Sequence, residues 1–441
     1  MLKSGFGKRY STYFGLFIVG ISILIIVRDI AALAYSKYVL VVFCALFFAV
    51  LTYEELVYAT FFLMPLLCGI PSTYIMLFDA VLLIFKASEI KIRTLVYMFI
   101  WIFLELLNML LLNMLWVKSP DYIEVVKYLA HVCVLFQLIL NTQCADYEKC
   151  VFFYVMGTIL LCAVVIIKSF MNTPSNWLWL FQNGWFRIGI TAAETTEMAL
   201  TLNANSLAYY SLVGIACGFA ELSLENKKHK TLYILTIILC AITGVLTVSR
   251  SFLLMMVVIC ILAFWGNLKK PKVLLISLCI AVVGTYGAIS VLKNYPEIWD
   301  GIEARFTSST FSTAGGRTVI MQKYLEAFLS SPQIALVGAG ATSYKDVIGF
   351  TESLHNGTEQ ILVCYGLLGA IAFVVGLLFP IFELKQKKKG LPRWLPFIAV
   401  VLFVQTIQFV NPPMLMMPYA VAVYILKIGE TDAGEEILNH C

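Results

Sequence analysis

Charged residues are scarce in this chain of 441 residues: Asp, Glu, Lys and Arg make up 13% of it, whereas 61% is hydrophobic. Soluble domains are closer to half apolar and a quarter charged, so the composition excludes an ordinary soluble protein. Apolar runs long enough to cross a bilayer as helices recur from one end to the other. The short alternating strands of a transmembrane barrel are missing. The sequence therefore predicts an all-α polytopic membrane protein.

Motifs of several enzyme classes are also absent. CxxC spacing, a P-loop, HExxH and GxSxG do not occur, so redox, nucleotide-hydrolysing, zinc-protease and serine-hydrolase chemistry have no support. The long polar segments contain no DxD pair that would hold magnesium. We expect no metal, no cofactor and no nucleic-acid partner. Asp79, Glu105 and Lys127 are scattered within apolar runs, which favours bonding between helices over an ion-coupled pump.

The twelve cysteines do not indicate a disulfide framework. Seven of them lie within apolar runs, where a free thiol behaves as a small buried hydrophobe. These seven are Cys44, Cys133, Cys162, Cys217, Cys240, Cys260 and Cys279.

Clusters of lysine and arginine orient the predicted helices. Basic residues gather on the cytoplasmic side of membrane proteins, and clusters at 86–93, 227–230, 269–272 and 385–393 mark that side. Placing helices between them predicts 12 to 14 crossings, with both termini cytoplasmic. The approximate spans are 13–34, 38–53, 56–70, 73–86, 94–116, 123–141, 150–168, 203–222, 231–248, 251–267, 273–292, 357–379, 394–410 and 413–428.

The first 26 residues resemble a signal sequence, because a basic flank precedes an apolar core. Ala32-Leu33-Ala34 even resembles a cleavage site, but Arg28 and Asp29 stand just before it. This favours a retained first span.

Residues 1–441 are expected to form a single integral membrane domain with two long polar loops on the outer face, at 169–202 and 293–356. Long loops often carry function, so we expect the chemistry there. The stretch RTVIMQKYLEAFLSS in the second loop predicts an amphipathic helix after Gly315-Gly316 and before Pro332. Its expected apolar side comprises Val319, Ile320, Tyr324, Leu325, Phe328 and Leu329.

Three residues of the predicted outer face could act on a phosphate-bearing substrate. Arg317 stands in the first turn of the amphipathic helix, where backbone N–H groups and a guanidinium can bind one anion. Arg250 interrupts an otherwise apolar run, which is costly unless it is paired or faces water. His355 is the one histidine of four that this topology places outside, and an imidazole suits a general base. Structural alternatives are pairing with lipid headgroups for the arginines and a polar helix cap for His355.

Weaker candidates complete this set. Arg187 lies among Trp177, Trp179 and Trp185, which fit an interfacial aromatic belt or a sugar-stacking surface. Arg305, Lys323 and Asn356 share the second loop and are candidates to line a substrate groove.

The ordered motifs R-I-G (187–189), N-A-N (203–205), S-R (249–250), G-G-R (315–317), G-A-G (338–340) and H-N…Y-G-L-L-G (355–369) resemble the O-antigen ligase and O-antigen polymerase superfamily. The resemblance covers about residues 185–375. It implies an inverting glycosyltransferase of the GT-C type that needs no metal. Arg250 and Arg317, and less securely Arg187, would bind the donor diphosphate, and His355 would be the base. Ala204 departs from the proline that many members have there.

The resemblance implies a bacterial inner-membrane enzyme with its active site on the outer face. We expect a polymerase that joins polyprenyl-diphosphate-linked oligosaccharide repeat units into a surface polysaccharide such as capsule or O-antigen. The alternative within the family is a ligase that transfers the same lipid-linked glycan to a different acceptor. Expected partners are membrane lipids, a chain-length regulator and a flippase. A glycan flippase or exporter is the alternative from another class, but the internal repeats typical of transporters are missing.

Overall fold

The computed structural model describes residues 10–115, 119, 121–141, 146–171, 188, 203–224, 229–265, 286, 290, 293–294, 296, 317–384 and 390–428. Within these ranges the regular structure is helical, without a strand, and the all-α prediction is confirmed. The elements are α1 (Thr12–Asp29), α2 (Lys37–Val50), α3 (Tyr53–Leu63), η1 (Met64–Gly69), α4 (Ser72–Lys86), α5 (Ile92–Leu115), α6 (Tyr122–Leu140), α7 (Tyr147–Met171), α9 (Ala204–Leu222), α10 (Lys230–Leu246), α11 (Arg250–Phe264), α14 (Arg317–Ser330), α15 (Pro332–Val337), α16 (Tyr344–Ile348), α17 (Gly357–Phe382), α18 (Leu391–Val404), η3 (Pro413–Met416) and α19 (Pro418–Lys427).

Helices coincide with thirteen of the 14 predicted spans, and the other span, 273–292, lies almost entirely outside the described residues. Among the described helices, α1, α5, α6, α7 and α17 are long and apolar enough to cross a membrane. The chain is therefore a polytopic membrane protein, while the number of crossings stays a prediction. The predicted span 394–410 is too long, because α18 ends at Val404. The last predicted span, 413–428, coincides with η3 and α19, which together form the apolar helical segment Pro413–Lys427.

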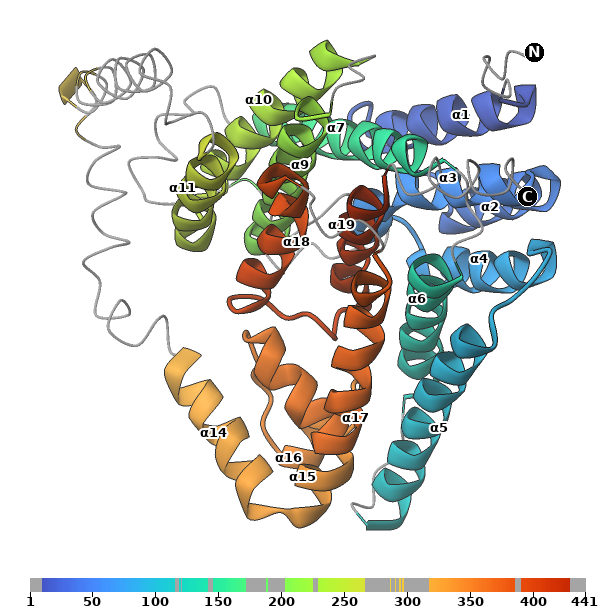
Figure 1. Cartoon of the computed structure of the whole chain (residues 1–441), viewed down its shortest axis with the longest axis vertical. Helices are drawn as coiled ribbons and strands as arrows, with labels where there is room; N and C mark the ends of the chain where they lie inside the picture. Colours follow the sequence, from blue (N-terminus) through green and yellow to red (C-terminus); the bar gives the residue numbers. More distant parts are fainter. Residues whose placement is uncertain are drawn as a thin grey trace, which may run out of the picture.

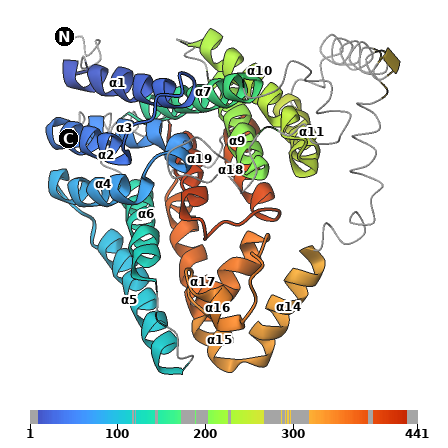
Figure 2. The same cartoon turned by 180° about the vertical axis from the view of Figure 1, so that it is seen from behind.

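The helices are arranged in three groups (Figures 1 and 2). α1 to α4 lie beside α7 at one end of the molecule. α5 and α6 run from this group toward the opposite end, where α14, α15 and α16 surround the first half of α17. α9, α10, α11 and α18 pack together and form the third group.

α9 is enclosed by its neighbours, since most of its residues are buried. Gly214 and Gly218, one turn apart, let α10 approach closely. A Cβ atom on Gly218 would stand 2.6 Å from Cγ1 of Ile237, and one on Gly214 would stand 2.8 Å from Sγ of Cys240. Small residues at this spacing are typical of close helix packing in membranes. α9 is therefore a fixed element with one end near each of the two sites described below.

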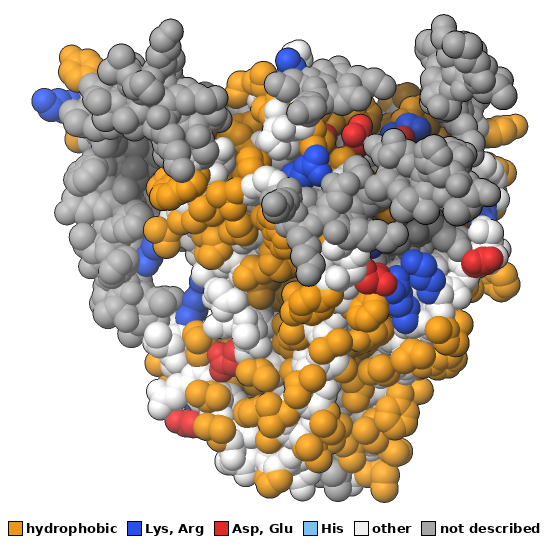
Figure 3. All heavy atoms as spheres, in the orientation of Figure 1, with side chains coloured by type: hydrophobic (Ala, Val, Ile, Leu, Met, Phe, Trp, Pro, Cys, Tyr) orange, Lys and Arg blue, Asp and Glu red, His pale blue; other side chains and the backbone are white. Residues whose placement is uncertain are grey.

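The outer side of α5 carries a row of exposed apolar side chains at helical spacing. Phe99, Phe103 and Leu110 are 67%, 65% and 54% exposed. Figure 3 shows the hydrophobic surface that dominates this end of the molecule. Such a row fits contact with lipid.

Asp79 bonds to another helix, as predicted, whereas Glu105 bonds to the turn after α15, and Lys127 pairs with Glu124 within α6 at 3.7 Å. Asp79 Oδ2 accepts a hydrogen bond from Thr60 Oγ1 at 2.7 Å, and Glu105 Oε1 accepts one from the Ala341 N–H at 3.3 Å. α1 is fastened similarly, because Arg28 donates to the Gly69 carbonyl at 2.6 Å and Lys168 pairs with Asp29 at 3.1 Å. The nine cysteines of the described ranges are free thiols.

Candidate functional site

Arg250, Arg317 and His355 are brought close together around the C-terminal end of α18. Arg317 is the first residue of α14, and its Nη1 donates to the Thr406 carbonyl at 3.2 Å. The positive charge of Arg250 helps to lower the pKa of Arg317, and Arg317 in turn helps to lower the pKa of His355. Residues 250, 317 and 355 therefore form one basic group, although up to 105 residues of sequence separate them.

Two anchored neighbours hold His355 in place. On one side, Leu354 is fully buried, and the Tyr324 hydroxyl donates to the Glu352 carbonyl at 2.7 Å. On the other side, Asn356 is the N-cap of α17, and its Oδ1 accepts from the Thr358 and Glu359 N–H groups at 3.0 and 3.2 Å. The sequence folds this way because asparagine is a preferred N-cap. The backbone at His355 is thus fixed directly before the start of α17.

The environment of His355 favours its neutral form. Burial is the largest cause that lowers its pKa below 6.5, and the positive charges of Arg317 and Lys345 lower it further. Glu352 acts in the opposite direction. A neutral imidazole can accept a proton near neutral pH, so the arrangement suits a general base.

Burial and the nearby Arg250 also lower the pKa of Arg317, yet a guanidinium stays charged at neutral pH. At the first residue of α14 its charge opposes the helix dipole. The Thr406 carbonyl, just beyond the end of α18, offsets this because carbonyls at a helix C-terminus attract cations. The guanidinium is therefore held by the Thr406 carbonyl, and its other N–H groups can donate to a ligand.

The amphipathic helix predicted over 317–331 is present as α14, but its predicted apolar side is partly wrong. Tyr324 and Phe328 are buried, whereas Val319, Leu325 and Leu329 are 50%, 47% and 72% exposed. The buried stripe follows positions 320, 324 and 328, at the i, i+4, i+8 spacing of a helix. The other three fall beside this stripe, because a helix turns by 100° per residue.

Of the four weaker candidates, Lys323 and Asn356 lie in the described part of the chain. The Lys323 ammonium lies 4.4 Å from the centre of the Phe350 ring, a cation–π contact on α14. Asn356 uses its side-chain oxygen for the cap described above. Arg187 and Arg305 lie outside the described residues. The residue after Arg187 is described, and the Ile188 N–H donates to the Leu246 carbonyl at the end of α10.

The N-A-N and S-R motifs meet each other in space. Ser249 Oγ donates to Asn205 Oδ1 at 3.3 Å, which connects the first turn of α9 to the residue before Arg250. Ser249 is also the N-cap residue of α11. This contact fixes the position of α11, whose first residue is Arg250.

The glycines of G-A-G and Y-G have a structural explanation. Gly338 and Gly366 both have positive φ, at 86° and 63°. The backbone at Gly338 packs against Cys364, and the backbone at Gly366 packs against Leu336. A Cβ on Gly338 would stand 2.2 Å from the Cys364 carbonyl oxygen, and one on Gly366 2.4 Å from the Leu336 carbonyl carbon. The Ala339 and Gly340 N–H groups donate to the Val363 and Cys364 carbonyls, both at 2.9 Å. These motifs join α15 to the kink of α17.

Three nearby residues were not selected from the sequence. Lys345 on α16 adds a positive charge next to His355. Glu359, in the first turn of α17, has two buried carboxyl oxygens without a hydrogen-bond partner in the described structure. Gln360 is fully buried, and its Oε1 accepts from the Phe409 and Val410 N–H groups at 2.8 and 2.9 Å. The sequence signal for Glu359 and Gln360 was their position: two polar residues at the start of an apolar run, shortly after His355 and the cap residue Asn356.

No group of three or more His, Cys, Asp or Glu side chains in the described ranges is arranged to hold a metal ion. The positive charge near His355 comes from arginine and lysine side chains.

Residues 235–374 match the O-antigen ligase family. This match supports the O-antigen ligase and polymerase superfamily that the sequence motifs resemble. The matched region contains Arg250, Arg305, Arg317, Lys323, His355 and Asn356, whereas Arg187 and the N-A-N motif precede it. No curated protein matches the chain. The matched family implies a glycosyl-transferring enzyme of the O-antigen ligase or polymerase kind, and its substrates are lipid-linked oligosaccharides. Together with the apolar helices, the match indicates an integral membrane protein.

Proposed function

We propose that this protein is a polysaccharide polymerase that joins polyprenyl-diphosphate-linked repeat units at the outer face of the bacterial cytoplasmic membrane. The observation that carries the proposal is the basic group of Arg250 and Arg317 next to a His355 whose environment favours a neutral imidazole. Arginines suit a diphosphate because their N–H groups match its oxygens in pairs. A neutral imidazole suits deprotonation of a sugar hydroxyl.

In the proposed step, His355 accepts the proton of an acceptor hydroxyl as that oxygen attacks the anomeric carbon of the donor. The new C–O bond forms while the bond from the anomeric carbon to the diphosphate oxygen breaks. The electron pair leaves with the lipid diphosphate, whose charge Arg250 and Arg317 stabilise. Attack opposite the leaving group inverts the anomeric configuration.

The position of these groups supports the proposal in a second way. Arg250 and Arg317 are the first residues of α11 and α14, and His355 precedes the first turn of α17. Helix N-termini carry partial positive charge and free N–H groups. The ends of α11 and α14 beside two guanidinium groups make an anion-attracting region, as a diphosphate requires, whereas the Thr358 and Glu359 N–H groups of α17 already bond to Asn356 Oδ1. Arg187 and Arg305 are further proposed contacts of the donor.

The test is a reconstituted assay with lipid-linked repeat unit, in the presence of a metal chelator. We expect a ladder of longer glycans from the wild type and its loss in His355→Ala and Arg317→Ala. The matched control is Arg93→Ala, because Arg93 lies away from the basic group and pairs instead with Glu383. A ladder that survives both site variants would contradict the assigned roles, and dependence on added metal would contradict the arginine mechanism.

A ligase is the second candidate function, because O-antigen ligase is the description of the matched family. It would use the same donor and the same three residues but transfer the glycan to a different acceptor. An intact wild type that makes no ladder, yet modifies an offered acceptor such as lipid A core, would establish the ligase. Movement of the lipid-linked glycan across liposomes without bond formation would instead indicate a flippase.

A further inference from the structure

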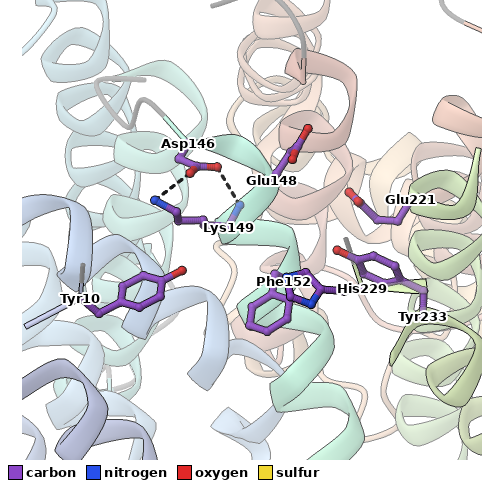
Figure 4. Close-up of a pocket in the computed structure, with 8 residues that line it drawn as sticks. All are labelled: Tyr10, Asp146, Glu148, Lys149, Phe152, Glu221, His229 and Tyr233. Atoms are coloured by element: carbon purple, nitrogen blue, oxygen red, sulfur yellow. Dashed lines mark hydrogen bonds and ion pairs between the residues drawn. The ribbon is translucent and has the colours of Figure 1, made fainter. Parts of the chain in front are cut away.

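A second cluster of charged and aromatic side chains lines a cavity of about 280 Å³ between α7, α9 and α10. Figure 4 shows it. Its lining residues are Tyr10, Asp146, Glu148, Lys149, Phe152, Glu221, His229 and Tyr233. All of them precede the region that matches the O-antigen ligase family.

The cavity lies at the opposite end of α9 from the basic group. Asn205, in the first turn of α9, contacts the residue before Arg250, whereas Glu221 is in the last turn. A helix of 19 residues is about 28 Å long, close to the thickness of a bilayer core. The cavity is therefore a separate site and not an extension of the first.

Glu221 is the unusual member of the lining. Its side chain is buried, with the residue only 6% exposed, yet Oε1 has no hydrogen-bond partner in the described structure. Figure 4 shows the carboxyl group directed from α9 into the space between α9 and α7. A buried acceptor without a partner is costly, and a buried carboxylate without a counter-charge is more so.

The position of Glu221 in the last turn of α9 increases the cost of burying a charged carboxylate. Carbonyl groups at the C-terminal end of a helix carry partial negative charge, which disfavours a carboxylate and favours a cation. Asp146 and Glu148 add two more acidic side chains to the same lining, against one lysine. Lys149 neutralises Asp146 and the positive charge of Arg393 also acts on Glu221, so the preference for a further cation is confined to the Glu221 side of the cavity.

One half of the cavity already holds an ammonium group. Lys149 Nζ pairs with Asp146 at 2.9 Å and lies 5.5 Å from the centre of the Tyr10 ring. The half around Glu221 has the same chemistry, with carboxyl groups and aromatic rings. The Phe152 and His229 rings are 4.8 Å apart, and the Tyr233 hydroxyl points toward the Glu221 carboxyl (Figure 4).

We propose that this half of the cavity binds the primary ammonium group of a small ligand, with Glu221 as its counter-charge. Aromatic walls favour an organic ammonium because ring faces attract such cations, and within the described residues the acidic side chains do not converge as metal ligands. Two sources share this chemistry: a free small amine and the headgroup of phosphatidylethanolamine.

Ethanolamine is the probe for the first source. Thermal unfolding of the purified full-length protein in detergent is measured with ethanolamine and with ethylene glycol, its uncharged counterpart, at equal ionic strength. Ligand binding to the folded state should raise Tm by about 2 °C or more in ethanolamine alone. Glu221→Gln should abolish this rise, and Glu326→Gln, an equal charge change on the exposed side of α14, should retain it.

Glu148→Gln provides a second variant, since Glu148 is an exposed member of the lining. It should reduce the response to ethanolamine without removing it. An equal rise in Tm for the wild type and Glu221→Gln would overturn the proposal.

Native mass spectrometry distinguishes the two sources. The protein is exchanged from mixed vesicles of phosphatidylethanolamine and phosphatidylglycerol. Selective retention of phosphatidylethanolamine by the wild type but not by Glu221→Gln would identify the lipid headgroup. Stabilisation by ethanolamine without lipid retention would identify a free amine. If ethanolamine does not stabilise the protein and phosphatidylethanolamine is not retained, Glu221 does not bind a cation.

Discussion

The Tyr324 hydroxyl donates to the Glu352 carbonyl at 2.7 Å, three residues before His355. It also lies 3.3 Å from the Phe350 carbonyl. One buried phenol on α14 thus fixes the turn that leads to the histidine, and the helix that begins with Arg317 is the same helix that places His355.

Tyr324→Phe tests this connection. Removal of one hydroxyl costs about 1 kcal/mol of stability, because the carbonyl acceptors lose their donor while the ring packing stays. We expect a small decrease in Tm but a larger loss of glycosyl transfer, of about tenfold, because the base is misplaced. Paired measurements of Tm and kcat check this. Activity that falls no more than stability explains would indicate a packing role only.

Two charges of opposite sign adjust His355, so two variants should shift its titration in opposite directions. Lys345→Gln removes a positive charge, which raises the pKa of His355 and moves the acid limb of the pH–rate profile to higher pH. Glu352→Gln removes a negative charge, which lowers the pKa and moves the limb to lower pH. The wild type should lose activity as the pH falls through a value below 6.5, where the imidazole becomes protonated.

Profiles of kcat/KM between about pH 5 and 8 measure these shifts. A shift in the same direction for both variants would contradict a titrating His355.

Gly338→Ala and Gly366→Ala should destabilise the protein more than Gly349→Ala. All three glycines have positive φ, which costs a residue with a Cβ about 1–2 kcal/mol. At Gly349 nothing lies within 4 Å of an added Cβ, whereas at Gly338 and Gly366 it would overlap backbone atoms at 2.2 and 2.4 Å. Thermal unfolding in detergent would rank the three variants, and equal losses would contradict the backbone contact between α15 and α17.

Gln360→Leu should cost about 2–6 kcal/mol, because it leaves the N–H groups of Phe409 and Val410 buried without an acceptor at about 1–3 kcal/mol each. Gln405→Leu is the control. Gln405 is exposed and bonds to Thr358, so its loss should cost about 0.5 kcal/mol or less. Comparison of the two Tm values decides whether Gln360 anchors the start of α17.

Much of the helical architecture could be predicted from the sequence, because apolar runs and prolines act locally. The end of α18 at Val404 was missed, since apolar residues continue beyond it in the sequence. Arg250, Arg317 and His355 could be selected from residue chemistry and motif order, and the structure places them together. Tyr324, Lys345 and Thr406 could not, because their contacts depend on how α14, α16 and α18 pack.

The packing role of the glycines in the G-A-G motif could not be predicted from the sequence either. A G-A-G motif indicates a turn, but only the packed helices show that Gly338 faces the Cys364 carbonyl. Asn356 illustrates the reverse case, in which a proposed groove residue follows an ordinary capping rule.

The burial of the cysteines makes a labelling test of membrane orientation possible. The nine cysteines of the described ranges are buried or half-buried, so they should react slowly with a maleimide. Cys144, Cys279 and Cys441 lie outside these ranges and can be replaced by serine. A new cysteine at Glu326, on the exposed side of α14, would then be the most reactive thiol in the protein. A membrane-impermeant maleimide applied to intact cells should label it if α14 faces outward, and labelling only after lysis would place the basic group on the cytoplasmic side.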